Sequence, residues 1–202
     1  MFYDKNGMFT PSHQLEKAAK GKKVVLYAPT HRQEGKIVFP LRKQFDFEKL
    51  NQWCVEHNMV FVIRRHFYHK NEEVDFSMYS NITDITKKSM DIQEILMDTD
   101  ILISDYSSTY IDYLLLDRPL IFYNFDYEDY LQNDREMYYD YDEVTPGYKA
   151  ATFDELMTEL DSIAKDEDHF VEDRQRVRNL FYCKEGQQMV GEKLLEFLKN
   201  LK

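Results

Sequence analysis

The stretch Asp100-Ile-Leu-Ile-Ser-Asp-Tyr-Ser-Ser108 decides the fold of this 202-residue chain. Its apolar part is typical of a buried strand, and it ends in a polar turn. Residues 109–116 then follow an amphipathic helical pattern, and Leu120-Ile-Phe-Tyr123 has the pattern of a second strand. Strand, tight turn, helix and strand predict one unit of an α/β sheet. The turn places hydroxyls, a carboxylate and backbone N–H groups at a helix N-terminus, so we expect it to bind a phosphate.

The same alternation continues on both sides of this unit. Strands are predicted at 23–28, 59–63 and 79–82, and helices at 45–58, 90–98, 153–165, 167–181 and 189–201. Nearly continuous apolar strands separated by helices favour a parallel sheet covered on both faces. We therefore expect one α/β domain over residues 1–202, a doubly wound parallel sheet, with residues 1–22 as a leading helical or extended segment.

The composition limits the partners and the compartment. The net charge of -11 disfavours nucleic acid and anionic membrane surfaces, although a phosphorylated small molecule needs only a local cationic cluster. The two cysteines, Cys54 and Cys183, lack paired spacing, so we expect neither a metal site nor a disulfide framework, and a reducing cytoplasmic compartment. No apolar run approaches the roughly 20 residues of a membrane span, so we expect any membrane contact to be peripheral.

Polar residues follow successive predicted strands. Pro29-Thr30-His31-Arg32, Arg64-Arg65-His66, Thr83-Asp84-Ile85-Thr86 and Ser104 to Ser108 stand at these ends. In open parallel sheets, ligands bind beyond the carboxyl ends of the strands, so these four segments share one edge. Their guanidiniums, imidazoles and hydroxyls fit a diphosphate and its sugar.

Each of these residues also has a simpler interpretation. Arg64 and Arg65 alone are explained as surface charges, His66 as structural and Asp105 as a helix cap, and His31 is interpreted as incidental. Their convergence on one edge favours a site.

Residues 124–143 hold eight acidic residues and five tyrosines around Arg135. This segment is interpreted mainly as a solvated loop, with Arg135 as a candidate phosphate ligand.

Four blocks resemble a known family. They are Leu26-Tyr-Ala-Pro-Thr-His-Arg32, the segment from Asp91 to Ser108, the segment from Asp112 to Tyr123, and the acidic and aromatic segment from Asp126 to Gly147. Together they resemble the C-terminal half of the CDP-glycerol glycerophosphotransferases, the teichoic acid primases and polymerases of bacterial cell walls. The resemblance spans roughly Val24 to the C-terminus.

The resemblance implies a GT-B architecture of two Rossmann-like domains, in which the C-terminal domain holds the donor. It implies transfer of glycerol phosphate, or a related polyol phosphate, from its CDP carrier to a lipid-linked acceptor, with no cofactor and no dedicated metal. A catalytic histidine of the family falls on His66, which we expect to be protonated; Phe67 stands where the family has proline. Ser107 and Ser108 would hold the donor phosphates, and the segment from Asn81 to Asp84 would lie near the ribose.

The complete set of expected site residues follows from these two lines of reasoning. His66 is the expected catalytic residue, and the expected donor-binding residues are Thr30, Arg32, Arg64, Arg65, Asn81, Thr83, Asp84, Asp105, Ser107, Ser108 and Arg135. The family's first domain, with its own catalytic histidine, has no counterpart before Val24. We therefore expect a fragment or a stand-alone half that binds the donor without turning it over, acts at the cytoplasmic face of the membrane and meets the acceptor through the missing domain.

Three alternatives remain open at this point. A GT-B glycosyltransferase would keep the fold and use a nucleotide sugar. A non-catalytic nucleotide-binding module would fit the missing domain. A receiver-like phosphoacceptor domain is disfavoured, because Pro29-Thr30 stands where an acidic pair should follow the first strand.

Overall fold

A six-stranded parallel sheet forms the centre of the computed structural model, which describes residues 12–33, 38–66, 70–71, 73–134, 136–182 and 190–200. Its strands are β1 (Lys23–Tyr27), β3 (Met59–Ile63), β5 (Ile82–Asp84), β6 (Ile101–Ser104), β7 (Leu120–Tyr123) and β8 (Tyr148–Ala150). The spatial order is β5-β3-β1-β6-β7-β8, and every neighbouring pair is parallel. This is the 3-2-1-4-5-6 order of a Rossmann fold, which confirms the predicted architecture.

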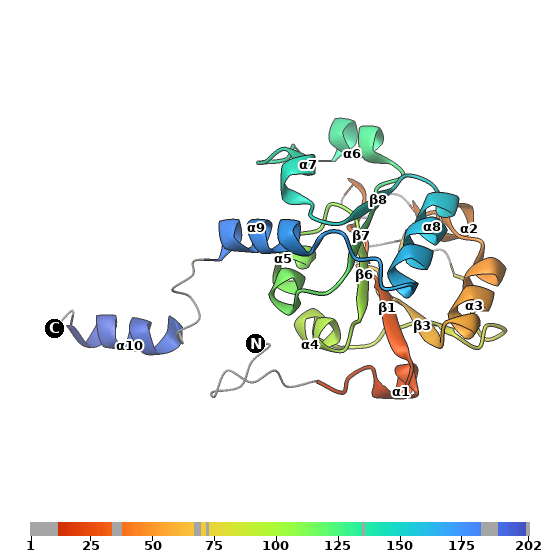
Figure 1. The fold of residues 1–202 in the computed structure, drawn as a ribbon, viewed down its shortest axis with the longest axis horizontal. Helices are drawn as coiled ribbons and strands as arrows, with labels where there is room; N and C mark the ends of the chain where they lie inside the picture. The colour runs from red at the N-terminus through yellow and green to blue at the C-terminus, as the bar shows by residue number, and fades with distance from the viewer. Residues whose placement is uncertain are drawn as a thin grey trace.

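Helices cover both faces of this sheet (Figure 1). One face carries α2 (Leu41–Gln44), α3 (Phe47–Glu56) and α8 (Phe153–Ala164), and the other carries α4 (Ile92–Met97), α5 (Thr109–Tyr113) with the 3-10 turn η2 (Leu114–Leu116), and α9 (Val171–Phe181). The remaining elements are α1 (Glu16–Ala19), β2 (Val38–Phe39) paired with β4 (Lys70–Asn71), α6 (Tyr127–Asn133), α7 (Tyr141–Val144) and α10 (Val190–Asn200). Among the described helices, none combines the length and apolar character needed to cross a bilayer.

The apolar strands are explained by this two-sided cover. On β1, Val25 and Tyr27 belong to the core under α3 and α8, whereas Val24 and Leu26 belong to the core under α4 and α5. Successive side chains of a strand point to opposite faces, so a strand buried on both sides must be apolar throughout. All four of these side chains are buried.

Local capping signals fix where several helices begin. The Asp46 carboxylate accepts hydrogen bonds from the backbone N–H groups of Glu48 and Lys49 at the start of α3. Thr152 and Glu155 form a reciprocal capping box at the start of α8. Such caps satisfy N–H groups that have no partner within the helix, which explains why these two predicted helices were located within two residues.

The third strand and the segment after β7 differ from expectation. The third strand is β5, three residues from Ile82 to Asp84, and not 79–82. The Tyr79 N–H donates to the Phe76 carbonyl in a turn, and the Asn81 N–H donates to the Asn51 side chain, so neither N–H group pairs with a neighbouring strand. The elements α6, α7 and β8 were not predicted. They are short, and the first two are strongly polar, so no apolar period marks them in the sequence.

Candidate functional site

The carboxyl ends of the central strands meet at one edge, as predicted. Tyr27, the last residue of β1, pairs with Ile63 of β3 and with Ile103 of β6. The ladder continues one step further, since the Ala28 N–H donates to the Ile103 carbonyl and the Arg64 N–H donates to that of Tyr27. The strand order reverses at β1, so the loops after β1 and β6 diverge there and leave space for a ligand.

A cleft of about 920 Å³ lies at this edge. It is lined by residues that follow β1, β3 and β6, by residues between α6 and α7, and by residues of α4, α5, α6, α7 and α9. Five of the predicted site residues line it: Thr30, Arg64, His66, Ser107 and Ser108. Small-molecule sites typically measure about 300–1,000 Å³, so the space suits a nucleotide diphosphate. His66 and Ser107 therefore face one common space, which was the spatial condition for the predicted site.

Two imidazoles lie side by side in the cleft. The ring centroids of His31 and His66 are 4.9 Å apart, and Arg64 lines the same space. The pKa of His66 is lowered from its usual value, first by burial and then by electrostatic interaction with His31 and Arg64. This direction favours the neutral imidazole in the ligand-free chain, and the expected protonation of His66 in the donor complex stays a prediction. His31 was interpreted as incidental, yet it lines the site.

The serine turn enters the cleft from the end of β6. The Ser107 hydroxyl donates to Thr109 Oγ1 at 2.8 Å and accepts from the Thr109 N–H at 3.2 Å. Ser108 is the N-cap of α5, is exposed, and makes no capping hydrogen bond with its side chain. The turn thus presents two hydroxyls beside the first N–H groups of a short helix.

Asp105 and Arg32 lie behind the cleft and do not line it. The buried Asp105 carboxylate accepts from the Thr30 N–H at 2.9 Å, from the Thr30 hydroxyl at 2.7 Å and from the Tyr106 N–H at 2.6 Å. It also pairs with Arg32 Nη2 at 2.8 Å. The carboxylate therefore joins the loop after β1 to the loop after β6.

Arg65, Asp84 and Thr83 are also placed outside the cleft lining. Arg65 is buried and pairs through Nη2 with Asp84 Oδ2 at 2.6 Å, while Thr83 is half-buried in β5. The Arg65 N–H donates to the Thr86 hydroxyl at 3.0 Å. These residues tie the loop after β3 to the loop after β5.

Asn81 lies at the opposite edge of the sheet. Its amide donates to the carbonyls of Cys54 and Met59 at 3.2 and 2.7 Å, and its Oδ1 accepts from Lys22 Nζ at 2.6 Å. Lys22 precedes β1 and Met59 begins β3, so this is the amino-terminal edge. The structure therefore does not bring Asn81 to the cleft where the ribose was expected. Arg135 lies outside the described residues.

The residues that sequence reasoning missed form a tyrosine wall on one side of the cleft. The tyrosine wall consists of Tyr106, Tyr130, Tyr138, Tyr139 and Tyr141. The Tyr106 and Tyr130 rings stack with centroids 3.9 Å apart. Four of the five come from the acidic and aromatic segment that was interpreted as a solvated loop. The concentration of tyrosines in this segment was a sequence signal for this role.

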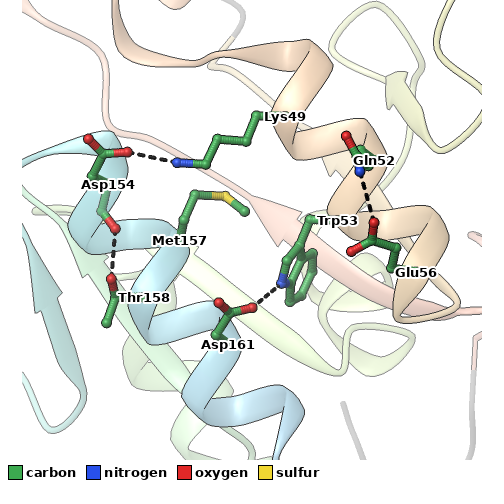
Figure 2. Close-up of a pocket in the computed structure, with 8 residues that line it drawn as sticks. All are labelled: Lys49, Gln52, Trp53, Glu56, Asp154, Met157, Thr158 and Asp161. Carbon is green, nitrogen blue, oxygen red and sulfur yellow. Dashed lines mark hydrogen bonds and ion pairs between the residues drawn. The ribbon is translucent and has the colours of Figure 1, made fainter.

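A second cavity of about 410 Å³ lies between α3 and α8, away from every predicted site residue (Figure 2). Its polar groups pair with one another. The Trp53 indole N–H donates to Asp161 at 2.6 Å, and Lys49 pairs with Asp154 at 2.8 Å. Within the described residues, no group of three or more His, Cys, Asp or Glu side chains is arranged to hold a metal ion.

Comparisons with solved structures agree with the fold. The wall teichoic acid polymerase TagF superposes with a TM-score of 0.68 at 23% identity, covering 98% of this chain and 54% of TagF. A UDP complex of Staphylococcus aureus MnaA superposes with a TM-score of 0.52 at 13% identity, covering 98% of this chain and 51% of that one. At these identities the similarity establishes a Rossmann-like domain of the kind found in GT-B enzymes.

Comparisons of sequence go further. TarK, a teichoic acid ribitol-phosphate polymerase of Staphylococcus aureus, is 38% identical over 156 residues, which are 76% of this chain and 29% of TarK. A teichoic acid poly(glycerol phosphate) polymerase of Bacillus spizizenii is 38% identical over 134 residues, 63% of this chain and 33% of the polymerase. The chain thus spans about a third of the length of these relatives. Because residues 13–198 match the family described as CDP-glycerol:poly(glycerophosphate) glycerophosphotransferase, the chain belongs to that family.

Proposed function

We propose that this chain is the donor-binding half of an enzyme that transfers glycerol phosphate, or a related polyol phosphate, from a CDP-polyol to a lipid-linked teichoic-acid-type acceptor. The observation that carries the proposal is the cleft at the switch point of the sheet. In a chain of this family, it gathers Arg64, His66 and the hydroxyls of Ser107 and Ser108 around one space. These are the groups that a diphosphate needs.

Each group has a separate part in the proposed reaction. The acceptor hydroxyl attacks the β-phosphorus of the donor, a new P–O bond forms, and the bond to the bridging oxygen breaks so that CMP leaves. Arg64 and the donors around Ser107 stabilise the negative charge that builds on the phosphates. The donor's charge raises the pKa of His66, so the imidazole takes up a proton and is able to pass it to the leaving CMP.

In this proposal, the acceptor and the membrane are bound by the part of the whole enzyme that this chain does not span. The base that accepts the hydroxyl proton belongs, by the family resemblance, to the other domain. We therefore propose that the isolated chain binds donor without turnover, and that the whole enzyme works at the cytoplasmic face of the membrane through peripheral contact.

Calorimetry with CDP-glycerol tests the proposal. Replacing His66 by Ala should weaken binding by about 10–100-fold, the effect of losing a charge-assisted hydrogen bond worth about 1.5–3 kcal/mol. His169→Ala is the matched control, because His169 is exposed and does not line the cleft. Parallel titrations with CDP-ribitol and UDP-glucose compare polyol donors with a nucleotide sugar. Tighter binding of UDP-glucose, or equal affinities of the wild type and His66→Ala, would reject the proposal.

A further inference from the structure

We propose that Arg32 is a positioning residue: it fixes the tyrosine wall against the loops that follow β1 and β6, and it does not contact the donor. The part that concerns the donor rests on the proposed function. Arg32 was expected among the phosphate ligands, since it follows the first strand. The structure gives its guanidinium a different set of partners.

Carboxylates and a carbonyl surround the guanidinium. Arg32 is 2% exposed, and it does not line the cleft. Its Nε and Nη2 donate to the two carboxylate oxygens of Asp126 at 2.6 and 3.0 Å, a bidentate pair. Nη2 also donates to Asp105 at 2.8 Å, and Nη1 to the Thr30 carbonyl at 2.6 Å. Such two-point pairing fixes the orientation of both partners as well as their distance.

These partners connect the site loops to the segment that carries the wall. Asp105 immediately follows β6, whereas Asp126 immediately precedes α6, which holds Tyr130. The Arg32 Cζ atom lies 4.9 Å from the ring centroid of Tyr106 and 5.2 Å from that of Tyr130. The Tyr106 hydroxyl donates to Asp126 at 3.0 Å. The guanidinium thus holds the two stacked rings by charge, by ring contact and through a shared carboxylate.

Two further hydrogen bonds hold the same segment, one near its middle and one at its end. The Gln33 N–H, next to Arg32 in the chain, donates to Asp134 at the end of α6 at 2.5 Å. The Tyr141 hydroxyl donates to the backbone carbonyl of Asp105 at 3.1 Å. The segment from Asp126 to Tyr141, which carries most of the tyrosine wall, is therefore bonded to the β1 and β6 loops at its start, near its middle and at its end. Arg32 makes the bonds at its start.

The charge of the cluster argues against a phosphate ligand at this position. Among the described residues, the Arg32 guanidinium pairs with two carboxylates, Asp105 and Asp126, so these three side chains together carry one net negative charge. These three side chains would repel a diphosphate, whereas Arg64 and His66 line the cleft. Arg32 therefore stabilises the shape of the cleft, whereas Arg64, and His66 once the bound donor has protonated it, supply positive charge to the cleft.

Hydrogen exchange and calorimetry on the same variants test the inference. In Arg32→Met, amides of residues 126–141 should exchange faster than in the wild type, and the affinity for CDP-glycerol should fall about tenfold or more, a free-energy change of about 1.4 kcal/mol. Arg32→Lys keeps the charge and loses the bidentate geometry, so it should restore only part of the affinity. Asp126→Asn weakens the same ion pair by changing its less buried partner. This variant replaces Arg32→Met in both measurements if Arg32→Met does not fold.

Arg174 offers the matched control. It is 1% exposed and pairs with Asp117 at 3.1 Å and with Asp168 at 2.7 Å, and none of these three residues lines the cleft. Arg174→Lys should lower stability while leaving both the exchange of 126–141 and the affinity for CDP-glycerol unchanged.

The outcomes separate this inference from the proposed function. Faster exchange confined to 126–141 together with weaker donor binding supports the inference. Unchanged exchange in both Arg32→Lys and Asp126→Asn overturns it. Faster exchange with wild-type affinity overturns the link to the donor. If the wild type binds no CDP-glycerol, the proposed function fails, and the exchange data alone decide whether Arg32 positions the wall.

Discussion

Replacing Asp105 by Ala should destabilise the fold strongly, because one buried carboxylate serves two loops. Its side chain is 1% exposed and pairs with Arg32, and it also accepts bonds from Thr30 and Tyr106. Removing one partner of a buried ion pair costs about 3–5 kcal/mol. Arg32 retains Asp126, which reduces the loss, but the Thr30 and Tyr106 N–H groups lose their acceptor at about 1–3 kcal/mol each. We expect a net loss of about 4 kcal/mol, a large part of the 5–15 kcal/mol typical of a domain.

Urea unfolding followed by circular dichroism and by the fluorescence of the single tryptophan, Trp53, measures this loss. Asp154→Ala is the matched control. It removes a carboxylate at the same 2.8 Å from its cation, Lys49, but those side chains are 86% and 50% exposed (Figure 2). An exposed pair contributes about 0–1 kcal/mol. If Asp105→Ala costs less than about 1 kcal/mol, or no more than the control, the assigned role of the buried carboxylate is wrong.

Three further predictions concern packing, capping and pH. Gly147→Ala should cost about 1–3 kcal/mol or more in urea unfolding, because a Cβ there would stand 2.5 Å from the Leu120 carbonyl oxygen of β7; an unchanged midpoint would show that the backbone gives way freely. Thr152→Ala should cost about 0.5–2 kcal/mol, since it removes the cap that Glu155 completes, and Thr152→Ser should keep most of it. The affinity for CDP-glycerol should fall as pH rises from about 6 to 8. Donor binding raises the lowered pKa of His66, so above the pKa of the free protein the imidazole must take up a proton when the donor binds. His66→Ala should flatten that profile, and a wild-type affinity independent of pH would contradict the assigned proton uptake.

The layout of the cleft could be predicted because it depends on local pattern. The apolar strand that ends at Ser104 and the polar turn after it predict a unit of a parallel sheet. A parallel sheet brings the carboxyl ends of its strands to one edge. This placed Thr30, Arg64 and His66 correctly at the cleft. Asn81 was misplaced for a related reason: the third strand begins at Ile82, so Asn81 precedes it and falls at the opposite edge.

The amino-acid sequence by itself determined the doubly wound sheet, the loops that border the ligand space and the family, since these follow from short-range periodicity and contiguous blocks. Tertiary structure alone decided which cations face the cleft. Arg32 and Arg64 both follow apolar strands, yet Arg32 is held by Asp105 and Asp126, 73 and 94 residues away in the chain, while Arg64 lines the cleft. An ion pair forms where two charges meet in space, at separations that no local pattern encodes. Only the folded structure therefore distinguishes the cations that line the ligand space from those that hold its loops in place.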